Sequence, residues 1–303
     1  MNRNPRCGIL GRPGGWHTTA LQTALYRCGI SAPCLPISRL TAGVGLRPWL
    51  TAPNAGNDAE DGDLARYDVL FVRTIPGGSL EQIIFRVDAL HRLENAGVRV
   101  VNSATAIERS VDKYYTSTLL EDAGLPTPRT VVTEQFDQAM AAFEALGSDV
   151  VVKPLFGSEG RGMVRITDAD TAYRVFRALE LGRYVYYLQE FVPHGCEDIR
   201  LFVIGTEVVA AMTRQGTNWK TNVAQGASVA PLEPSPELQA FALRAAQAVG
   251  ADYAGVDILP IVGGGYTVVE VNGIPGWRGL QRATGVDVAE RLVVYALGAE
   301  SGA

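Results

Sequence analysis

Short apolar runs alternate with segments of helical length along the first hundred residues. Residues 7–10 and 67–73 are dominated by apolar side chains, a pattern typical of buried parallel strands. Each run is followed by a loop that contains glycine and proline and then by a predicted helix, at residues 18–28 and 80–96. Strands that alternate with helices form parallel sheets, so residues 1–103 are predicted to be a small α/β domain.

Two loops of this domain directly follow predicted strands, at residues 12–17 and 73–79. Ligands bind beyond the carboxyl ends of the strands in such sheets, so these loops form a candidate ligand edge. The first loop lacks the dinucleotide fingerprint, because Pro13 interrupts it and the glycine spacing differs. Residues 39–63 are rich in Gly, Pro, Asn and Asp and are predicted to be a loop.

The rest of the chain shows strands that pair through turns beside helices, which is typical of α+β folds. We place a central subdomain at residues 104–188 and a C-terminal subdomain at residues 189–303. A helix is predicted over residues 106–123, where a Gly-Leu-Pro sequence stops it.

Residues 254–279 contain two strand-like runs on either side of a glycine triplet, with Asp257, Glu270 and Asn272 among apolar neighbours. Side chains alternate along a strand, so Glu270 and Asn272 point to the same face. Two carboxylates and an amide carbonyl are the hard oxygen donors that suit Mg²⁺ carried in with nucleotide phosphates. An ordinary hairpin with polar residues at its solvent-exposed end is the alternative interpretation of this stretch alone.

The register of this hairpin decides whether Asp257 joins the other two oxygen donors. A loop at residues 263–265 directs Asp257 away from Glu270. A loop at residues 262–265 places Asp257 directly opposite Glu270, and a bulge at Pro260 has the same effect. We predict the register in which the two carboxylates face each other.

Upstream, residues 157–162 lie between two predicted strands, so their amides can turn inward and hold phosphate oxygens. They are not a Walker A loop, because no Gly-Lys-Ser/Thr sequence follows, and a plain glycine-rich turn is the alternative. Lys153 is more informative, since lysine rarely ends a buried strand without an anionic partner. Lys113, which follows Asp112 at the start of a helix, is a weaker candidate.

Further polar segments follow in order. Residues 184–192 form an extended segment whose backbone can hydrogen-bond the edge of a purine. Asp198 and Arg200 share one face of a strand, and Arg214 and residues 220–222 add cationic and amide groups before the metal hairpin. Each of these segments alone is compatible with a solvated surface, so only their order along the chain indicates a functional site.

Composition narrows the class of protein. The chain has 303 residues, of which 47% are hydrophobic and 19% charged, a globular balance with room for more than one lobe. The net charge of −5 argues against a nucleic-acid binder that relies on bulk positive charge. Its four cysteines form no CxxC pair, and no apolar run is long enough to span a bilayer. We therefore expect a soluble cytoplasmic protein with no nucleic-acid or membrane partner, and leave a homo-oligomer open.

From about residue 110 to residue 297 the chain resembles the ATP-grasp superfamily and, within it, the RimK-like α-L-glutamate ligases. The resemblance is carried by all of these segments together: the two lysines, the glycine loop, the Gln-Glu-Phe segment, the Asp-Ile-Arg strand, the Lys-Thr-Asn segment, and the hairpin with its Gly-Val-Asp and Glu-Val-Asn sequences. It implies an α/β and α+β chain, with an ATP-grasp fold preceded by an N-terminal parallel α/β pre-ATP-grasp domain.

The resemblance also implies a role for each matched residue. Lys113 and Lys153 contact ATP phosphates, Glu190 and Phe191 hold adenine through their backbone, and Asp198 binds the ribose. Mg²⁺, with Mn²⁺ as a substitute, is implied to bind Asp257, Glu270 and Asn272. Arg200 and Arg214 are implied to neutralise an acyl phosphate. The full set of residues implied to bind ATP is Lys113, Lys153, Gly157, Ser158, Gly160, Gly162, Glu190, Phe191, Asp198, Lys220, Thr221 and Asn222.

The chain departs from the ribosomal-protein-modifying enzymes of that family. Lys220 replaces an arginine, the segment 190–198 is one residue shorter, and Trp277 and Arg278 stand where those enzymes have smaller or acidic residues. The Trp-Arg variant is similar to ligases that glutamylate small coenzymes, such as the tetrahydromethanopterin glutamate ligase branch. We therefore expect Trp277, Arg278 and Arg73 to bind a small, flat, acid-bearing acceptor.

The predicted function is an ATP-dependent carboxylate–amine ligase that forms an amide through an acyl phosphate. Its expected partners are a small carboxylate-bearing coenzyme or metabolite and an amino acid, which we expect to be L-glutamate. The alternatives are a glutamate ligase that acts on a protein C-terminus, an ATP-grasp kinase that phosphorylates an alcohol, and a non-catalytic nucleotide-binding protein. The presence of both Asp257 and Glu270 argues against the last of these.

Overall fold

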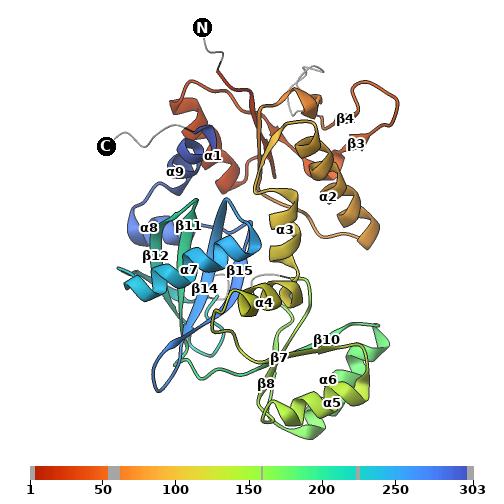
Figure 1. Cartoon of the computed structure of the whole chain (residues 1–303), viewed down its shortest axis with the longest axis vertical. Coiled ribbons are helices and arrows are strands. Elements are labelled where there is room, and N and C mark those ends of the chain that lie inside the picture. The colour runs from red at the N-terminus through yellow and green to blue at the C-terminus, as the bar shows by residue number, and fades with distance from the viewer. Residues whose placement is uncertain (1–3, 54–61, 158–159, 223–225, 299–303) are drawn as a thin grey trace.

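The computed structural model describes residues 4–53, 62–157, 160–222 and 226–298. Along these residues the chain builds an N-terminal, a central and a C-terminal sheet, with the N-terminal part at the top of Figure 1 and the central part at the bottom. In the described residues no helix is both long and apolar enough to cross a membrane.

The N-terminal sheet has the order β2-β1-β5-β6, and all of its pairings are parallel. Helix α1 follows β1, and helix α2, which begins at a capping box between Ser79 and Gln82, follows β5. The predicted parallel α/β domain is confirmed. The bounds are β1 Cys7–Leu10, β2 Cys34–Leu35, β5 Val69–Val72, β6 Arg99–Val101, α1 Trp16–Arg27 and α2 Leu80–Asn95.

The segment predicted as a loop over residues 39–63 contains a short antiparallel pair, β3 (Thr41–Ala42) with β4 (Leu50–Thr51), in its described part. Residues 54–61 lie outside the described residues. The two-residue strands are too short to give the alternating pattern from which a strand is predicted.

The central sheet has the order β7-β10-β8-β9 and is antiparallel throughout. Helices α5 and α6 cover it, and Phe143, Phe176 and Leu188 belong to an apolar core of its own. The bounds are β7 Thr130–Thr133, β8 Val150–Lys153, β9 Val164–Ile166, β10 Tyr186–Glu190, α5 Phe136–Ala145 and α6 Ala169–Leu181.

The C-terminal sheet has the antiparallel order β13-β12-β11-β14-β15. Helix α7 packs against it, while α8 and α9 follow β15. The bounds are β11 Glu197–Ile204, β12 Glu207–Gln215, β13 Ser228–Pro231, β14 Tyr253–Pro260, β15 Tyr266–Asn272, α7 Pro236–Val249, α8 Arg278–Thr284 and α9 Val288–Leu297.

The single helix predicted over residues 106–123 is two helices, α3 (Ala104–Val111) and α4 (Lys113–Asp122). Asp112 separates them, because its backbone is extended and its side chain accepts a hydrogen bond from the Tyr115 amide at 3.0 Å. An aspartate inside an apolar helical pattern can act as an N-cap, and here it places Lys113 at the first residue of α4.

The N-terminal domain and the C-terminal sheet share one apolar core, to which Phe71, Phe202 and Leu292 contribute. Helix α9 lies beside α1, so the end of the chain returns to its beginning (Figure 1). The fully buried side chain of Asn102 donates to the carbonyl of Tyr253 at 2.7 Å and accepts from the Tyr253 amide at 3.0 Å. These contacts hold the start of the β14–β15 hairpin against the N-terminal sheet. The domain limits at residues 103 and 188 stay predictions.

Candidate active site

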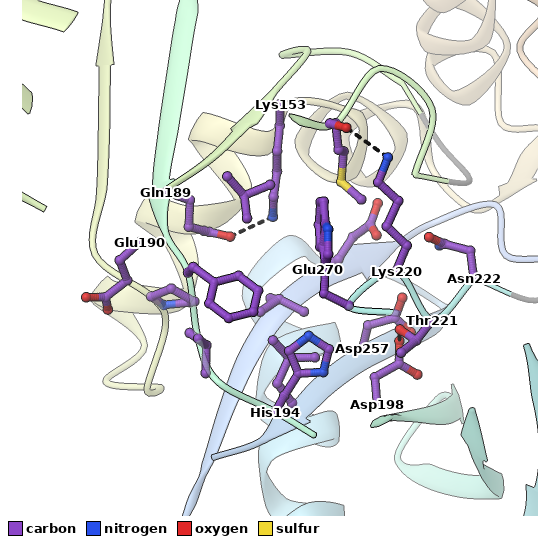
Figure 2. A pocket seen from close by; sticks show the side chains of 18 of the residues that line it. Lys153, Gln189, Glu190, His194, Asp198, Lys220, Thr221, Asn222, Asp257 and Glu270 are labelled. Carbon is purple, nitrogen blue, oxygen red and sulfur yellow. Dashed lines mark hydrogen bonds between the residues drawn. The ribbon is translucent and has the colours of Figure 1, made fainter. Parts of the chain in front are cut away.

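A pocket lies between the central and C-terminal sheets, with walls from β8 and β10 on one side and β14 and β15 on the other (Figure 2). Arg200 and Asn272 are not part of its lining. The predicted residues that line it are Lys113, Lys153, Glu190, Phe191, Asp198, Arg214, Lys220, Thr221, Asn222, Asp257 and Glu270.

Asp257 and Glu270 face each other across the hairpin, which confirms the predicted pairing. The route to it differs from the prediction, because Pro260 pairs with Tyr266 and leaves a longer loop at residues 261–265. The register then shifts between Asp257 and Ile258, where Val269 is the extra residue on β15. The predicted loop at residues 262–265 is therefore one residue too short, Pro260 is regularly paired rather than bulged, and the bulge at Val269 offsets the longer loop.

Asn272 belongs to the same strand face as Glu270 but pairs with Gly255, further from the hairpin loop. Its side-chain oxygen accepts a hydrogen bond from the Ile274 amide at 3.0 Å. The amide oxygen of Asn272 is thus already occupied in part, and its role as a metal ligand stays a prediction.

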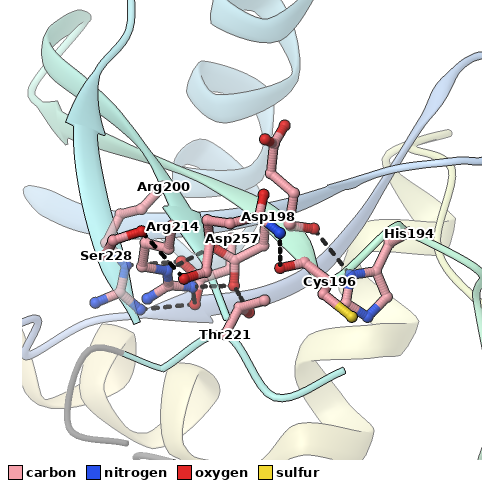
Figure 3. A network of polar contacts seen from close by, with 10 residues as sticks. His194, Cys196, Asp198, Arg200, Arg214, Thr221, Ser228 and Asp257 are labelled. Atoms are coloured by element: carbon pink, nitrogen blue, oxygen red, sulfur yellow. Dashed lines mark hydrogen bonds and ion pairs between the residues drawn. The ribbon is translucent and has the colours of Figure 1, made fainter. Parts of the chain in front are cut away.

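The buried carboxylate of Asp257 is bound by both predicted catalytic arginines (Figure 3). Arg200 donates through Nε at 2.7 Å and through Nη2 at 2.6 Å, and Arg214 Nη2 lies 2.9 Å from the same carboxylate. Burial alone raises the pKa of Asp257, but the two guanidinium groups outweigh it and lower this pKa to about 2. Asp257 is therefore ionised at neutral pH.

Asp198 lies on the other side of Arg214 and completes this ionic network. Arg214 Nη2 donates to Asp198 at 2.7 Å, and the Thr221 hydroxyl donates to the same carboxylate oxygen. Burial raises the pKa of Asp198, and the Arg214 guanidinium opposes that rise. Asp198 is only 4% exposed and both of its oxygens are engaged, so the structure links it to Arg214, and its contact with a ribose stays a prediction.

Two lysines lie close enough to Glu270 for its charge to act on them. Lys153 donates to the side-chain oxygen of Gln189 at 2.6 Å, and Lys113 donates to the carbonyl of Gly157 at 2.7 Å. Burial lowers the pKa of Lys153 to about 8 and lowers that of Lys113, while Glu270 favours the charged form of both. In the described residues Glu270 makes no hydrogen bond or ion pair of its own, and its side chain points into the pocket (Figure 2).

The glycine loop and the Lys-Thr-Asn segment meet at the mouth of the pocket. Gly160 and Gly162 have φ values of +68° and +74°, which favour glycine. Lys220 donates to the carbonyl of Met163, immediately after this loop, at 2.9 Å (Figure 2). Ser158 lies outside the described residues, so its predicted contact with ATP stays a prediction.

At the opposite end, the backbone amides of Glu190 and Phe191 donate to the carbonyls of Arg129 and Asp149. These two N–H groups are therefore unavailable to a purine. The next residue, Val192, lines the pocket, and its amide has no hydrogen-bond partner in the described residues. The predicted adenine contact thus narrows to the carbonyls of the segment and this one amide.

Sequence reasoning assigned no role to several residues that line the pocket, among them Gln189, His194, Met163 and Trp219. The rings of His194 and Trp219 lie 5.9 and 6.3 Å from that of Phe191, centroid to centroid. Gln189 lies two residues from Tyr187 on β10, so strand alternation was the signal that its side chain shares the buried face.

The expectation that Trp277 and Arg73 bind the acceptor is wrong. Trp277 is fully buried, with its ring 4.7 Å from that of His17 and 4.3 Å from the Arg73 guanidinium carbon. Arg73 is 9% exposed and donates to the Tyr253 hydroxyl at 2.9 Å and to the Pro275 carbonyl at 2.8 Å. Both side chains hold the N-terminal domain against the C-terminal sheet.

Arg278, by contrast, is exposed at the start of α8, with its guanidinium carbon 5.9 Å from the ring of Trp16. Neighbouring His17 accepts a hydrogen bond from the Trp277 amide at 3.0 Å. Burial, Arg73 and Arg278 together lower the pKa of His17 to about 4, so this histidine is neutral at neutral pH. Arg278 remains available as a surface cation beside an exposed aromatic ring.

The donor set fits a divalent cation that also contacts phosphates. Asp257 and Glu270 are opposed hard-oxygen donors at the pocket, and Glu270 is uncommitted. No cluster of three or more His, Cys, Asp or Glu suited to a metal occurs among the described residues.

The comparisons with known proteins agree with this geometry. The family described as the RimK-like ATP-grasp domain matches residues 110–296. The tetrahydromethanopterin:alpha-L-glutamate ligase of Methanococcus maripaludis is 34% identical over 297 residues, which cover 96% of this chain and 98% of that protein. The alpha-aminoadipate–LysW ligase LysX of Sulfurisphaera tokodaii is 35% identical over 66% of this chain and 72% of its own.

A solved structure of the ATP-grasp ligase PsnB, complexed with a precursor variant, Mg and ADP, has the same fold. It superposes with a TM-score of 0.73 at 22% identity and covers 98% of this chain and 99% of its own. The two curated relatives named here are both ligases, which confirms the predicted class of enzyme. The chain belongs to the RimK-like ATP-grasp family.

Proposed function

We propose that this protein is an ATP-dependent ligase that joins the amino group of L-glutamate to a carboxylate of a small coenzyme. The observation that carries the reaction type is the arrangement around Asp257. Arg214, two opposed carboxylates and two lysines line one pocket, and Arg200, outside that lining, binds the Asp257 carboxylate. The full-length likeness to a tetrahydromethanopterin:alpha-L-glutamate ligase supports the acceptor class and the amino acid.

The reaction begins with attack of the acceptor carboxylate on the γ-phosphoryl group of ATP. The new oxygen–phosphorus bond forms as the bond to the ADP oxygen breaks, which gives an acyl phosphate and ADP. Lys153 and Lys113 supply positive charge beside the transferred group. When bound by Asp257 and Glu270, Mg²⁺ supplies further charge neutralisation, and Mn²⁺ is proposed to substitute for it.

In the second step the amine nitrogen attacks the acyl carbon, the carbon–nitrogen bond forms, and inorganic phosphate leaves as the amine loses its proton. Arg200 and Arg214 each bind carboxylates through Nε and Nη2. Their Nη1 groups have no partner among the described residues. We assign to these donors the role of stabilising the oxyanion and the departing phosphate.

The acceptor enters from the side of the N-terminal domain in this proposal. With Trp277 and Arg73 buried, exposed Arg278 and Trp16 are the cation and ring that remain for an acid-bearing aromatic molecule. The Trp277 amide, just before Arg278, donates to His17, the neighbour of Trp16, so this surface lies beside the segment that follows β15.

A screen of ADP release tests the proposal. Amino acids are combined with small aromatic carboxylate coenzymes and, separately, with a folded acidic carrier protein, and product masses are recorded. We expect ADP only when L-glutamate and a small coenzyme are both present, with one oxygen-18 label passing from the acceptor carboxylate to phosphate. Release of ADP with an alcohol and no amine indicates a kinase, and glutamylation of the protein alone contradicts the small acceptor.

A further inference from the structure

Gln189 lies in the pocket wall between the two sheets, and its side chain is only 3% exposed. Its amide oxygen accepts the hydrogen bond from Lys153 at 2.6 Å (Figure 2). Its amide nitrogen donates to the Thr130 hydroxyl at 3.0 Å and to the Tyr187 hydroxyl at 3.3 Å. The side chain therefore uses its acceptor on the pocket side and both donors on the sheet side.

The neighbouring hydroxyl groups fix this orientation. The Thr130 hydroxyl donates its hydrogen to the carbonyl of Pro128 at 2.9 Å, so its oxygen can only accept from Gln189. On the other side, Ser117 donates to the carbonyl of Lys113 at 2.8 Å, which leaves the Ser117 oxygen as an acceptor.

The Tyr187 hydroxyl, 2.9 Å from the Ser117 oxygen, must then be the donor in that contact. Its own oxygen is left to accept from Gln189, as the Thr130 oxygen does. Both groups on the sheet side therefore require N–H donors, and only the amide nitrogen supplies them. The amide oxygen of Gln189 is consequently held facing Lys153.

The need for such a group follows from the charges nearby. Lys153 is half-buried in the pocket wall, and Glu270 is the acid whose charge most favours its protonated form. Opposite charges in a buried pocket attract strongly, and Glu270 has no other partner in the described residues. Without a competing acceptor, the ammonium and the carboxylate would close on each other. Such a pair removes a cation from the phosphates and a ligand from the metal.

We propose that Gln189 is a positioning residue, which holds the Lys153 ammonium away from Glu270 so that the lysine stays available to phosphate and the carboxylate to Mg²⁺. This inference rests on the proposed use of ATP but not on the identity of the acceptor or the amino acid. Nucleotide binding therefore tests it even if the coenzyme screen finds no product.

The test compares Gln189→Leu and Gln189→Met with the native protein by calorimetry of Mg²⁺·AMP-PNP and of adenosine. Both variants keep the side-chain volume and remove the acceptor. We expect AMP-PNP to bind about tenfold more weakly, in the range of a hydrogen bond to a charged group. The Mg²⁺ concentration needed for half-maximal AMP-PNP binding should rise, while adenosine affinity changes by less than about twofold, because the base end is untouched.

Two controls separate positioning from general disruption. Thr130→Val removes one sheet-side partner of Gln189 but leaves the acceptor of Lys153 in place, so AMP-PNP binding should be near native. In a Lys153→Met background, Gln189→Leu should have no further effect on AMP-PNP binding. Equal weakening of adenosine and AMP-PNP, or additive effects of Gln189→Leu and Lys153→Met, would overturn the proposal.

Discussion

Strand β14 meets two arginine sites of different kinds. Arg73 contacts Tyr253 at the start of the strand, where its partners are a hydroxyl, a carbonyl and the ring of Trp277. Arg200 and Arg214 contact Asp257 four residues further on, and their partners are carboxylates. An arginine bound to a carboxylate beside an open pocket can exchange that partner for a phosphate. An arginine enclosed by a ring and a carbonyl cannot, and it serves packing instead.

The largest expected effect lies on the pocket side of this comparison. Replacing Glu270 by alanine removes a proposed metal ligand. It also removes the negative charge that favours the protonated forms of Lys153 and Lys113. We expect the rate of ADP release to fall by about a thousandfold. Thermal unfolding should change little, because Glu270 makes no hydrogen bond in the described residues. Near-native ADP release at ordinary Mg²⁺ would show that Glu270 is not a metal ligand.

The sequence predicts those features of the site that neighbouring residues determine, but not those that depend on tertiary packing. The Asp257–Glu270 pairing was predicted correctly, but from a loop that is one residue too short, and the bulge at Val269 compensates for that residue. This bulge was not predictable, since it follows from how the hairpin packs on its neighbours. Gln189 was overlooked because the prediction considered only the backbone of its segment. The burial of Trp277 against Arg73 depends on docking of two domains, which no local pattern encodes.

The next effect is on stability and tests the packing side. Trp277→Ala empties a fully buried ring site between Arg73 and His17. We expect the free energy of unfolding to fall by about 3–5 kcal/mol, measured by urea titration. Trp277→Phe serves as the control and should lose less, because it keeps most of the buried ring. A loss of activity towards the coenzyme with unchanged stability would instead restore Trp277 as a substrate-binding residue.

A third prediction concerns acid. The pKa of His17 is about 4 in the folded protein, below its ordinary value of 6.5, so between these values the unfolded chain binds more protons. Stability should therefore fall as the pH drops from 6.5 towards 4, by as much as about 3 kcal/mol. His17→Gln keeps an acceptor for the Trp277 amide and should remove this part of the pH dependence. An unchanged profile in that variant would assign the acid sensitivity to other groups.

The smallest expected effect separates exposed Arg278 from buried Arg73. Arg278 has no ion pair in the described residues and stands beside the ring of Trp16, so removing it should leave the fold intact. If it binds an acceptor carboxylate from the surface, Arg278→Ala should raise the KM for the coenzyme by roughly two- to fivefold, as for a solvent-accessible ion pair, with kcat near native. Arg278→Lys, which keeps the charge but loses the paired donors, should have a KM between those of the native protein and Arg278→Ala.

Arg73→Met is expected to lower stability without this selective change in KM. Arg278→Ala and Arg73→Met therefore distinguish a binding arginine from a packing one. An unchanged KM in Arg278→Ala would move the acceptor site away from α8.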